Sequence, residues 1–181
     1  MIEQALAKEG LELSPTQIEK LKLFSDKLEW YNRVHNISGA KTKEAIVENI
    51  IDSIVPTQFI PQPKRLLDVG TGAGFPGLLL ALIWEETTTD LAEPINKRAT
   101  FLRLMGQELE LPNLSVFKDK VENLDTEPFN LISSRAVTNT QLLLDLTKKV
   151  SNNETEYLFY KGSNVYKEIE TLDSQLKYDI V

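Results

Sequence analysis

The stretch LLDVGTGAGFPG, residues 66–77, places four glycines within eight positions, directly after an apolar run that contains the acid Asp68. Ordering a glycine costs more backbone entropy than ordering any other residue, so we expect a local structural reason for each of these glycines. The stretch lies between an apolar segment typical of a strand and one typical of a buried helix. We interpret it as a strand-to-helix turn whose bare backbone lies against a nucleotide-like cofactor.

Two cofactors fit the spacing of these glycines. Residues 72–77 satisfy the dinucleotide pattern G-x-G-x-x-G, with Glu93 19 residues after Gly74, which would suit NAD. Residues 70–74, preceded by Asp68, instead fit the acid-x-G-x-G-x-G loop of S-adenosylmethionine (SAM) methyltransferases, in which the acid lies beside the ammonium group of the cofactor. We favour SAM, because an acid at this point would repel a pyrophosphate.

The composition is that of an ordinary globular protein without thiol or metal chemistry. The chain has 181 residues, 41% hydrophobic and 26% charged, which suits one compact unit. It has no cysteine and a single histidine, His35, so thiolate nucleophiles, disulfides and multi-histidine metal sites are excluded. Because no signal peptide or membrane-length apolar run is present, we expect a cytoplasmic protein with no membrane partner. The net charge of −7 opposes binding to nucleic acid unless a local basic patch forms.

The hydrophobic pattern divides the chain into a helical part and an alternating part. Residues 1–60 carry helical spacing, with a capping box and a proline start at residues 14–17. Beyond a proline-punctuated connector, strand-like runs alternate with helical ones, which indicates a parallel sheet covered on both faces. We predict a mostly parallel, doubly wound α/β core over residues 61–181 with an N-terminal helical cap over residues 1–60.

The boundaries of the expected elements follow from the same pattern. Strands are predicted at residues 65–69, 87–93, 114–118, 129–134 and 156–161. Helices are predicted at residues 45–54, 76–84, 94–109, 139–150 and 165–176, in addition to the one that starts at the capping box.

Two places beyond the glycine turn are candidates for contact with the cofactor. Glu93 ends the second strand, where a carboxylate can accept both ribose hydroxyls; alternatively it stabilises the start of the helix after Pro94. Val121 and Glu122 follow the third strand, where an apolar side chain can pack on an adenine ring and backbone groups can read its edge. The alternative for this pair is a plain loop.

Several motifs occur together in a characteristic order. They are DVGTGAGFPG, EPINKRATFL, KVENL, ISSRAV and YKG, preceded by WYNRVHNIS and IIDSI. Over residues 14–170 the chain resembles the bacterial ribosomal RNA small-subunit methyltransferase G family, also called the glucose-inhibited division B family. The resemblance implies the Rossmann-like class I SAM-dependent methyltransferase fold. It also implies methyl transfer from SAM to N7 of one guanine in 16S rRNA, presented as free RNA, a small ribosomal subunit or an assembly intermediate.

The resemblance further implies site residues. In the family the cofactor is contacted by the first loop glycine, by a bulky apolar residue before Pro-Gly and by the pair after the third strand; these match Gly70, Phe75, Val121 and Glu122. An arginine after the fourth strand matches Arg135, which we expect to be catalytic. The full predicted cofactor set is Asp68, Gly70, Gly72, Gly74, Phe75, Glu93, Val121, Glu122 and Arg135, with no metal.

Two departures from the family pattern bear on the RNA side. Asn130 stands where the family usually has an aspartate at the start of the fourth strand. Glu48 and Asn49 stand where Arg-His often precedes the pair that matches Asp52-Ser53, which removes cationic character.

A lone-pair acceptor agrees with the residues present. Guanine N7 has no proton to remove, so the reaction needs positioning rather than a general base. Arg135 would bind guanine O6 or stabilise charge near the cofactor or a phosphate; its alternative is a surface salt bridge. We expect RNA contacts from a basic helix face and one later lysine, namely Lys97, Arg98, Arg103 and Lys161, whose alternative is a solvated surface. We expect a monomer.

Two other functions stay open from the residues alone. One is a SAM-dependent methyltransferase that acts on a small molecule. The other is a noncatalytic module that binds RNA or a nucleotide and retains the glycine loop.

Overall fold

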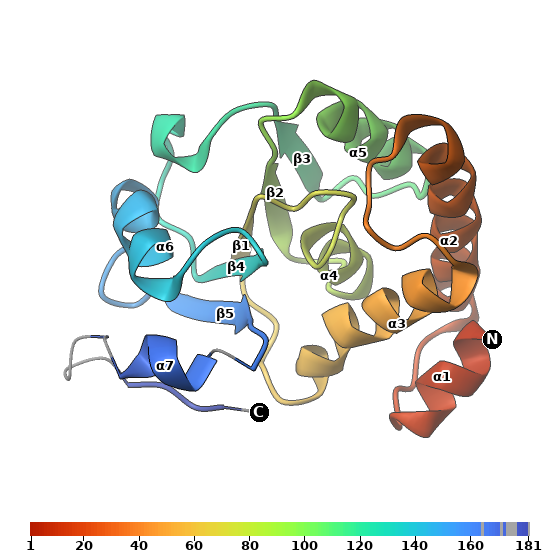
Figure 1. The fold of residues 1–181 in the computed structure, drawn as a ribbon, viewed down its shortest axis with the longest axis horizontal. Coiled ribbons are helices and arrows are strands. Elements are labelled where there is room, and N and C mark those ends of the chain that lie inside the picture. Colours follow the sequence, from red (N-terminus) through yellow and green to blue (C-terminus); the bar gives the residue numbers. More distant parts are fainter. Residues whose placement is uncertain (164, 171, 173–176, 181) are drawn as a thin grey trace.

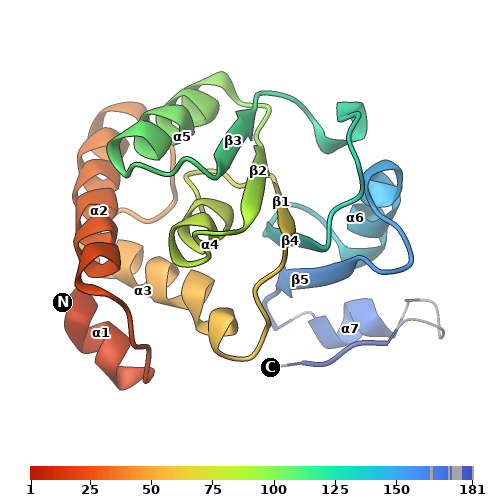
Figure 2. The same cartoon turned by 180° about the vertical axis from the view of Figure 1, so that it is seen from behind.

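A five-stranded parallel sheet forms the centre of the computed structural model, which describes residues 1–163, 165–170, 172 and 177–180. The strand order is β3-β2-β1-β4-β5, and each neighbouring pair is parallel (Figures 1 and 2). The strands are β1 (Arg65–Val69), β2 (Thr88–Ala92), β3 (Leu114–Phe117), β4 (Leu131–Arg135) and β5 (Glu156–Tyr160). All of them begin within two residues of the start predicted from the sequence.

Helices cover both faces of the sheet. They are α1 (Ile2–Lys8), α2 (Pro15–His35), α3 (Lys43–Ile54), α4 (Gly77–Ile83), α5 (Asn96–Glu108), α6 (Thr140–Thr147) and α7 (Val165–Ile169). Short 3-10 turns are η1 (Val55–Gln58), η2 (Val121–Asn123) and η3 (Lys148–Val150). Within the described part of the chain, no helix combines the length and apolar character needed to cross a membrane.

The order of the strands creates one place where the chain changes direction across the sheet. From β1 the chain moves outward through β2 to β3 and then returns to β4 on the other side of β1. The connections after β1 and β4 therefore leave in opposite directions from neighbouring strands. In open parallel sheets ligands bind outside the carboxyl ends of the strands at this point, which predicts the position of the functional site.

The predicted start of α2 is confirmed. The Ser14 hydroxyl accepts a hydrogen bond from the Gln17 backbone N–H at 3.2 Å, and the Gln17 side chain accepts one from the Ser14 N–H at 3.0 Å. This reciprocal pair satisfies two backbone donors that the first turn would otherwise leave free, and Pro15 needs no donor there.

Some predicted helix boundaries are wrong by a few residues. The helix expected from Pro94 starts at Asn96, because the Glu93 carboxylate accepts the Ile95 N–H and keeps that residue extended. The helix expected across residues 139–150 ends at Thr147 and continues as a 3-10 turn. Of the helix expected over residues 165–176, α7 is observed, and residues 171 and 173–176 lie outside the described part.

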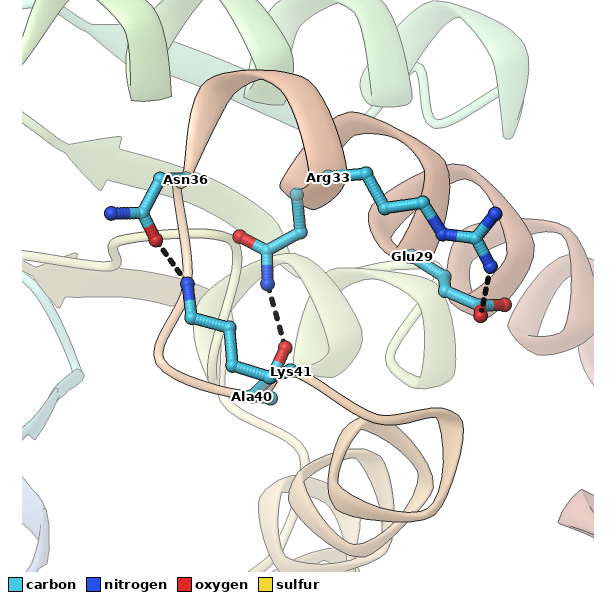
Figure 3. A pocket seen from close by; sticks show the side chains of 6 residues that line it. Glu29, Arg33, Asn36, Ala40 and Lys41 are labelled. Atoms are coloured by element: carbon cyan, nitrogen blue, oxygen red, sulfur yellow. Dashed lines mark hydrogen bonds and ion pairs between the residues drawn. The ribbon is translucent and has the colours of Figure 1, made fainter.

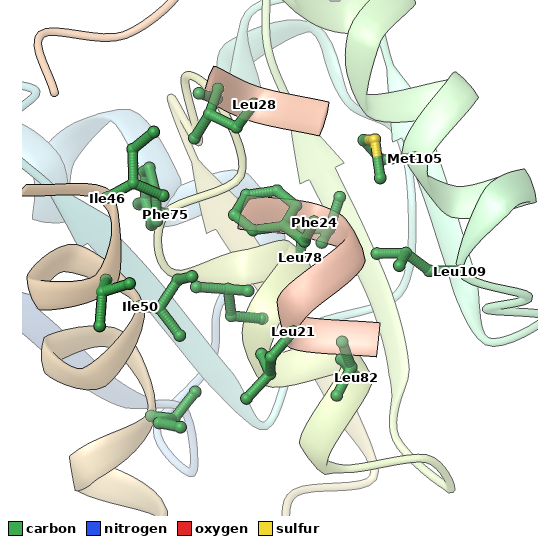
Figure 4. Packing of buried hydrophobic residues seen from close by; sticks show 14 of the residues in the cluster. Leu21, Phe24, Leu28, Ile46, Ile50, Phe75, Leu78, Leu82, Met105 and Leu109 are labelled. Carbon is green, nitrogen blue, oxygen red and sulfur yellow. The ribbon is translucent and has the colours of Figure 1, made fainter. Parts of the chain in front are cut away.

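The N-terminal helices share a hydrophobic cluster with the core helices (Figure 4). Phe24 of α2 lies at its centre, with its ring centroid 5.7 Å from that of Phe75 and 6.4 Å from that of Phe101. Leu21 and Leu28 of α2, together with Ile50 of α3, are fully buried in the same cluster. A second cluster lies between α6 and the other face of the sheet. The first 60 residues therefore depend on α4 and α5 for their burial.

Asn113, just before β3, connects this strand through hydrogen bonds to α4 and to the segment between α4 and β2. Its side-chain amide donates to three carbonyl oxygens, those of Ala81, Trp84 and Thr87, at 3.0 to 3.2 Å. We expect Asn113→Ala to lower the free energy of unfolding by about 2 kcal/mol, because it removes these three partly buried hydrogen bonds. Urea denaturation measures the loss. Asn153→Ala at an exposed turn is the control and should change the value by less than about 0.5 kcal/mol; equal effects of both variants would contradict the assignment.

Candidate active site

The residues singled out in the sequence meet at the carboxyl ends of β1, β2 and β4. The glycine turn follows β1, Glu93 follows β2, η2 follows β3 and Arg135 ends β4. The register aligns Val69 with both Ala92 and Ser134, so these three strands end at the same level. The glycine turn, Glu93 and Arg135 therefore lie at one edge of the sheet, and their contacts with a cofactor stay predictions.

Asp68 lies at the base of this site and is fully buried. One carboxylate oxygen accepts from the Gly77 N–H at 2.9 Å, and the other accepts from the Ser133 hydroxyl at 2.7 Å. Burial raises the pKa of the Asp68 carboxyl to about 6, against the opposing effect of these hydrogen bonds. The carboxylate thus ties β1, β4 and the start of α4 together, and the predicted contact with the ammonium group of a cofactor stays a prediction.

At two positions of the glycine turn, neighbouring side chains of the protein leave no room for a Cβ. A Cβ on Gly77 would lie 2.5 Å from Leu91 Cδ2 and closer still to Asp68, so only glycine lets α4 approach the sheet here. Gly70 has φ +67°, and a Cβ there would lie 2.5 Å from Val137 Cγ2 in the loop after β4. Gly72 differs, because it has φ +61° and nothing within 4 Å of the Cβ position. The interpretation that a ligand excludes every Cβ in the turn is therefore too broad, since Leu91 and Val137 do so at two positions.

Glu93 joins two loops of the site. It is only 2% exposed, and its oxygens accept from the N–H groups of Gly72 and Ile95, each at 2.9 Å. Its negative charge also raises the pKa of Asp68 slightly. Glu93 thus stabilises the entry to α5, and its predicted contact with ribose hydroxyls remains to be tested.

The apolar candidates occupy different environments. Val121 is buried in the cluster beneath α6, and Glu122 beside it in η2 is exposed. Phe75 is buried and packs on Phe24 of α2. Their predicted contacts with the cofactor stay predictions.

Arg135 bridges the end of β4 and helix α3. Its guanidinium donates to the Asn49 side-chain oxygen through Nη2 and to the Asn49 backbone carbonyl through Nη1, the latter at 3.5 Å. Nη2 also lies 3.6 Å from an Asp52 carboxylate oxygen, and the guanidinium carbon is 5.9 Å from the centre of the Phe75 ring. With a side chain 24% exposed, Arg135 lies at the rim of the site rather than on the open surface.

The four predicted RNA-binding side chains all contact neighbouring parts of the protein. Lys97 donates to the carbonyls of His35 and Asn36, and Arg98 donates to that of Ile37, so both hold the loop after α2 against α5. The remaining two are on separate elements: Arg103 donates to the Val116 carbonyl, and Lys161 binds the Thr138 carbonyl and the Glu168 carboxylate. Lys97 and Arg103 are exposed, whereas Lys161 is largely covered.

A polar pocket of about 340 Å³ lies at the C-terminal end of α2 and the loop after it (Figure 3). Its polar groups are paired with one another: Arg33 with Glu29, Lys41 with Asn36, and the Asn32 amide with the Ala40 carbonyl. We assign no ligand to it. Among the described residues, no group of three or more His, Asp or Glu side chains could hold a metal ion.

Three residues at the site were missed by reasoning from sequence. They are Ser133, Asn49 and Tyr160, whose hydroxyl donates to the Ser53 carbonyl at 2.7 Å. Burial raises the pKa of Tyr160, with a further contribution from the negative charge of Asp68, so its phenol stays a donor at neutral pH. The only sign of them in the sequence was the departure from the family pattern at Glu48-Asn49. The spacing of residues along the chain does not predict which side chains of α3 contact β4.

Two solved structures with similar folds are methyltransferases. A coclaurine N-methyltransferase bound to N-methylheliamine and SAH matches with a TM-score of 0.56 and 15% identity, covering 87% of this chain and 55% of that one. An O-methyltransferase from Bacillus cereus in complex with SAH also gives 0.56, at 18% identity over 88% and 74% of the two chains. The fold is therefore that of the class I SAM-dependent methyltransferases.

Sequence relatives define the family within this class. Residues 17–181 match the family described as rRNA small subunit methyltransferase G, to which the chain belongs. Ribosomal RNA small subunit methyltransferase G of Aliarcobacter butzleri is 41% identical over 170 residues, which cover 94% of this chain and 88% of that protein. The protein of the same name from Wolinella succinogenes is 43% identical over 153 residues, covering 84% and 79%. The resemblance stated from the motifs is thereby confirmed.

Protonation of Asp68 should be measurable as a dependence of stability on pH. Its pKa rises from 3.8 to about 6 on folding, so the folded state binds this proton more tightly and Asp68 favours folding less as pH rises from 4 to 7. At about 1.4 kcal/mol per pKa unit, the ionised carboxylate costs the folded state about 3 kcal/mol. Asp68→Asn removes the charge but keeps the shape of the side chain.

We therefore expect the stability of Asp68→Asn relative to the parent protein to increase between pH 4 and pH 7.5. Chemical denaturation at several pH values measures the difference, from which the contributions of carboxylates that do not interact with Asp68 cancel. A difference that stays constant with pH would show that the pKa of Asp68 is not raised.

Proposed function

We propose that this protein transfers the methyl group of SAM to N7 of a guanine in 16S rRNA. Membership of the rRNA small subunit methyltransferase G family, at 41% and 43% identity to two of its members, is the observation that carries the proposal. The coclaurine N-methyltransferase and the O-methyltransferase of similar fold share 15% and 18% identity with the chain, which supports the common fold alone. The family relationship therefore favours RNA over a small molecule as the methyl acceptor.

The charges around the glycine turn favour SAM over a dinucleotide. Binding of a pyrophosphate would use the N–H groups at the start of α4, but the Gly77 N–H is occupied by the Asp68 carboxylate. Asp68 and Glu93 are both buried beside the turn, and their negative charge would repel a phosphate and attract a cation. A sulfonium with an ammonium group fits this environment, so the residues present suit the proposed cofactor.

We assign the predicted cofactor residues as follows. The backbone at Gly70 and Gly72 would lie along the cofactor, Glu93 would accept from the ribose, and the η2 segment at Val121 and Glu122 would lie against the base. Support comes from their convergence at the ends of β1, β2 and β3. When bound, SAM supplies an electrophilic methyl group, and the protein supplies orientation and exclusion of water.

The acceptor side of the site requires no base. Guanine N7 carries an available lone pair, so the chain has only to present the base to the methyl group. We propose that Arg135 binds the guanine O6 edge or the phosphate of the target nucleotide, because its contacts with Asn49 engage two of the five N–H groups of a guanidinium. Lys97 and Arg103 are exposed and would contact flanking phosphates, while Arg98 and Lys161 would hold the loops beside them.

Incubation with SAM labelled in the methyl group and with undermodified 16S rRNA or small subunits tests the reaction. We expect label on one guanine, identified as 7-methylguanine after digestion. Because we assign Arg135 to the target nucleotide rather than to the cofactor, the Arg135→Ala variant should lose most of this activity while keeping its affinity for SAM. Labelling of small metabolites alone would contradict the proposal, as would SAM binding without turnover on any ribosomal substrate.

Gly72 allows a separate test of the cofactor site. We expect Gly72→Ala to weaken SAM binding about tenfold, or about 1.4 kcal/mol, because the new methyl group enters space that the protein leaves open. Isothermal titration calorimetry measures the affinity. Gly10→Ala is a matched control, since Gly10 has a similar φ of +67° and equally open surroundings but lies far along the chain near α1.

Both alanine variants should lose a similar amount of stability, about 1–2 kcal/mol, because alanine is strained at positive φ. Only Gly72→Ala should lose affinity for SAM. If it binds SAM as tightly as the parent protein does, the turn is not the cofactor site.

A further inference from the structure

Two polar side chains of α3, Asn49 and Asp52, face Arg135, and the sequence does not show this contact. Asn49 and Asp52 are three residues apart on the helix and so point in the same direction. Asn49 contacts the guanidinium with both its side-chain oxygen and its backbone carbonyl, and an Asp52 oxygen lies 3.6 Å from Nη2. These contacts join the N-terminal helices to the end of β4 at the rim of the site.

The position of Asn49 is itself fixed by the packing of α3. Ile50, Ser53 and Ile54 on the same helix are fully buried. The Ser53 hydroxyl donates to the Asn49 carbonyl at 2.6 Å, and the Ser53 carbonyl accepts from Tyr160 of β5 at 2.7 Å. The Tyr160 contact thus holds α3 to the sheet, and the Ser53 hydroxyl fixes the Asn49 carbonyl within the helix, so that Asn49 is presented to Arg135 from a packed support.

We infer that Asn49 is a positioning residue for Arg135, which it holds in the orientation needed to bind the target nucleotide. The inference rests on the proposed function, because that function gives Arg135 its contact with RNA. The arrangement has two parts: an acceptor that fixes the direction of the guanidinium, and a packed helix that fixes the acceptor.

The two α3 side chains differ in their effect on the charge of Arg135. An amide oxygen accepts from a guanidinium without cancelling its positive charge, whereas a carboxylate in the same place would cancel it. The Asp52 side chain is 70% exposed, so water screens its charge, and a salt bridge of this kind contributes little. The charge of Arg135 is therefore kept for an anionic or electron-rich ligand.

Two substitutions of Asn49 separate orientation from charge. Asn49→Leu removes the side-chain acceptor, keeps the branch at Cγ and suits a helix, so we expect kcat on rRNA to fall about tenfold while the affinity for SAM is unchanged. Asn49→Asp keeps the acceptor, so kcat should stay close to that of the parent protein. Its added negative charge should raise KM for RNA, and higher salt should reduce that increase.

Glu48→Leu is the matched control, because Glu48 is the exposed neighbour of Asn49 on α3. This variant makes the same kind of polar-to-leucine change on the same helix and should retain the kcat of the parent protein. Thermal denaturation of all three variants shows whether a loss of rate follows a loss of stability. Equal kcat values for Asn49→Leu and Glu48→Leu would overturn the inference.

A second measurement does not depend on activity. The guanidinium ¹⁵N resonances of Arg135, assigned with Arg135→Lys, should show slow rotation in the parent protein and in Asn49→Asp, and fast rotation in Asn49→Leu. Identical rotation in all three proteins would overturn the positioning role.

The kinetic results distinguish this inference from the proposed function. If Arg135→Ala is inactive but Asn49→Leu has the kcat of the parent protein, only the inference about Asn49 fails. If Arg135→Ala is fully active, the proposed role of Arg135 fails, and the inference fails with it.

Discussion

The buried carboxylate of Asp68 is the contact on which the site depends. It accepts from the Gly77 N–H and the Ser133 hydroxyl, so one side chain joins the ends of β1 and β4 to the first residue of α4. Burying a charge is unfavourable, and the raised pKa of about 6 reflects that cost. The two hydrogen bonds offset part of it and fix the glycine turn between two strands that diverge at the switch point.

The same contact sets the electrostatic character of the turn. In a dinucleotide-binding fold the start of the first helix faces a pyrophosphate, but here a carboxylate occupies the Gly77 N–H. Glu93 adds a second buried acid, linked to the turn through the Gly72 N–H. Two buried acids beside an open glycine backbone suit the positively charged cofactor that we propose, and they make binding of a phosphate-bearing ligand unfavourable.

The N-terminal helices complete the other side of the site. They are buried in the same hydrophobic cluster as α4 and α5. Three polar contacts also fix their orientation: Tyr160 binds the Ser53 carbonyl, Arg135 binds Asn49, and Lys97 binds the end of α2. Apolar packing is tolerant of small rotations, whereas a hydrogen bond requires a particular angle. These contacts therefore set where the helices end relative to the strands.

Local signals in the sequence determined the elements and the class of site. The capping box at Ser14, the alternation of strand and helix patterns and the turn from Gly70 to Gly77 are each properties of neighbouring residues, and they predicted the parallel sheet, its switch point and the cofactor loop. The motifs also placed the chain in its family. Only the tertiary structure decided which groups contact each other. Leu91 and Val137 limit two of the glycines, Lys97 and Arg98 hold the loop after α2, and Asn49 meets Arg135 across 86 residues. Such pairings depend on how whole elements pack, and the spacing of residues along the chain carries no information about them.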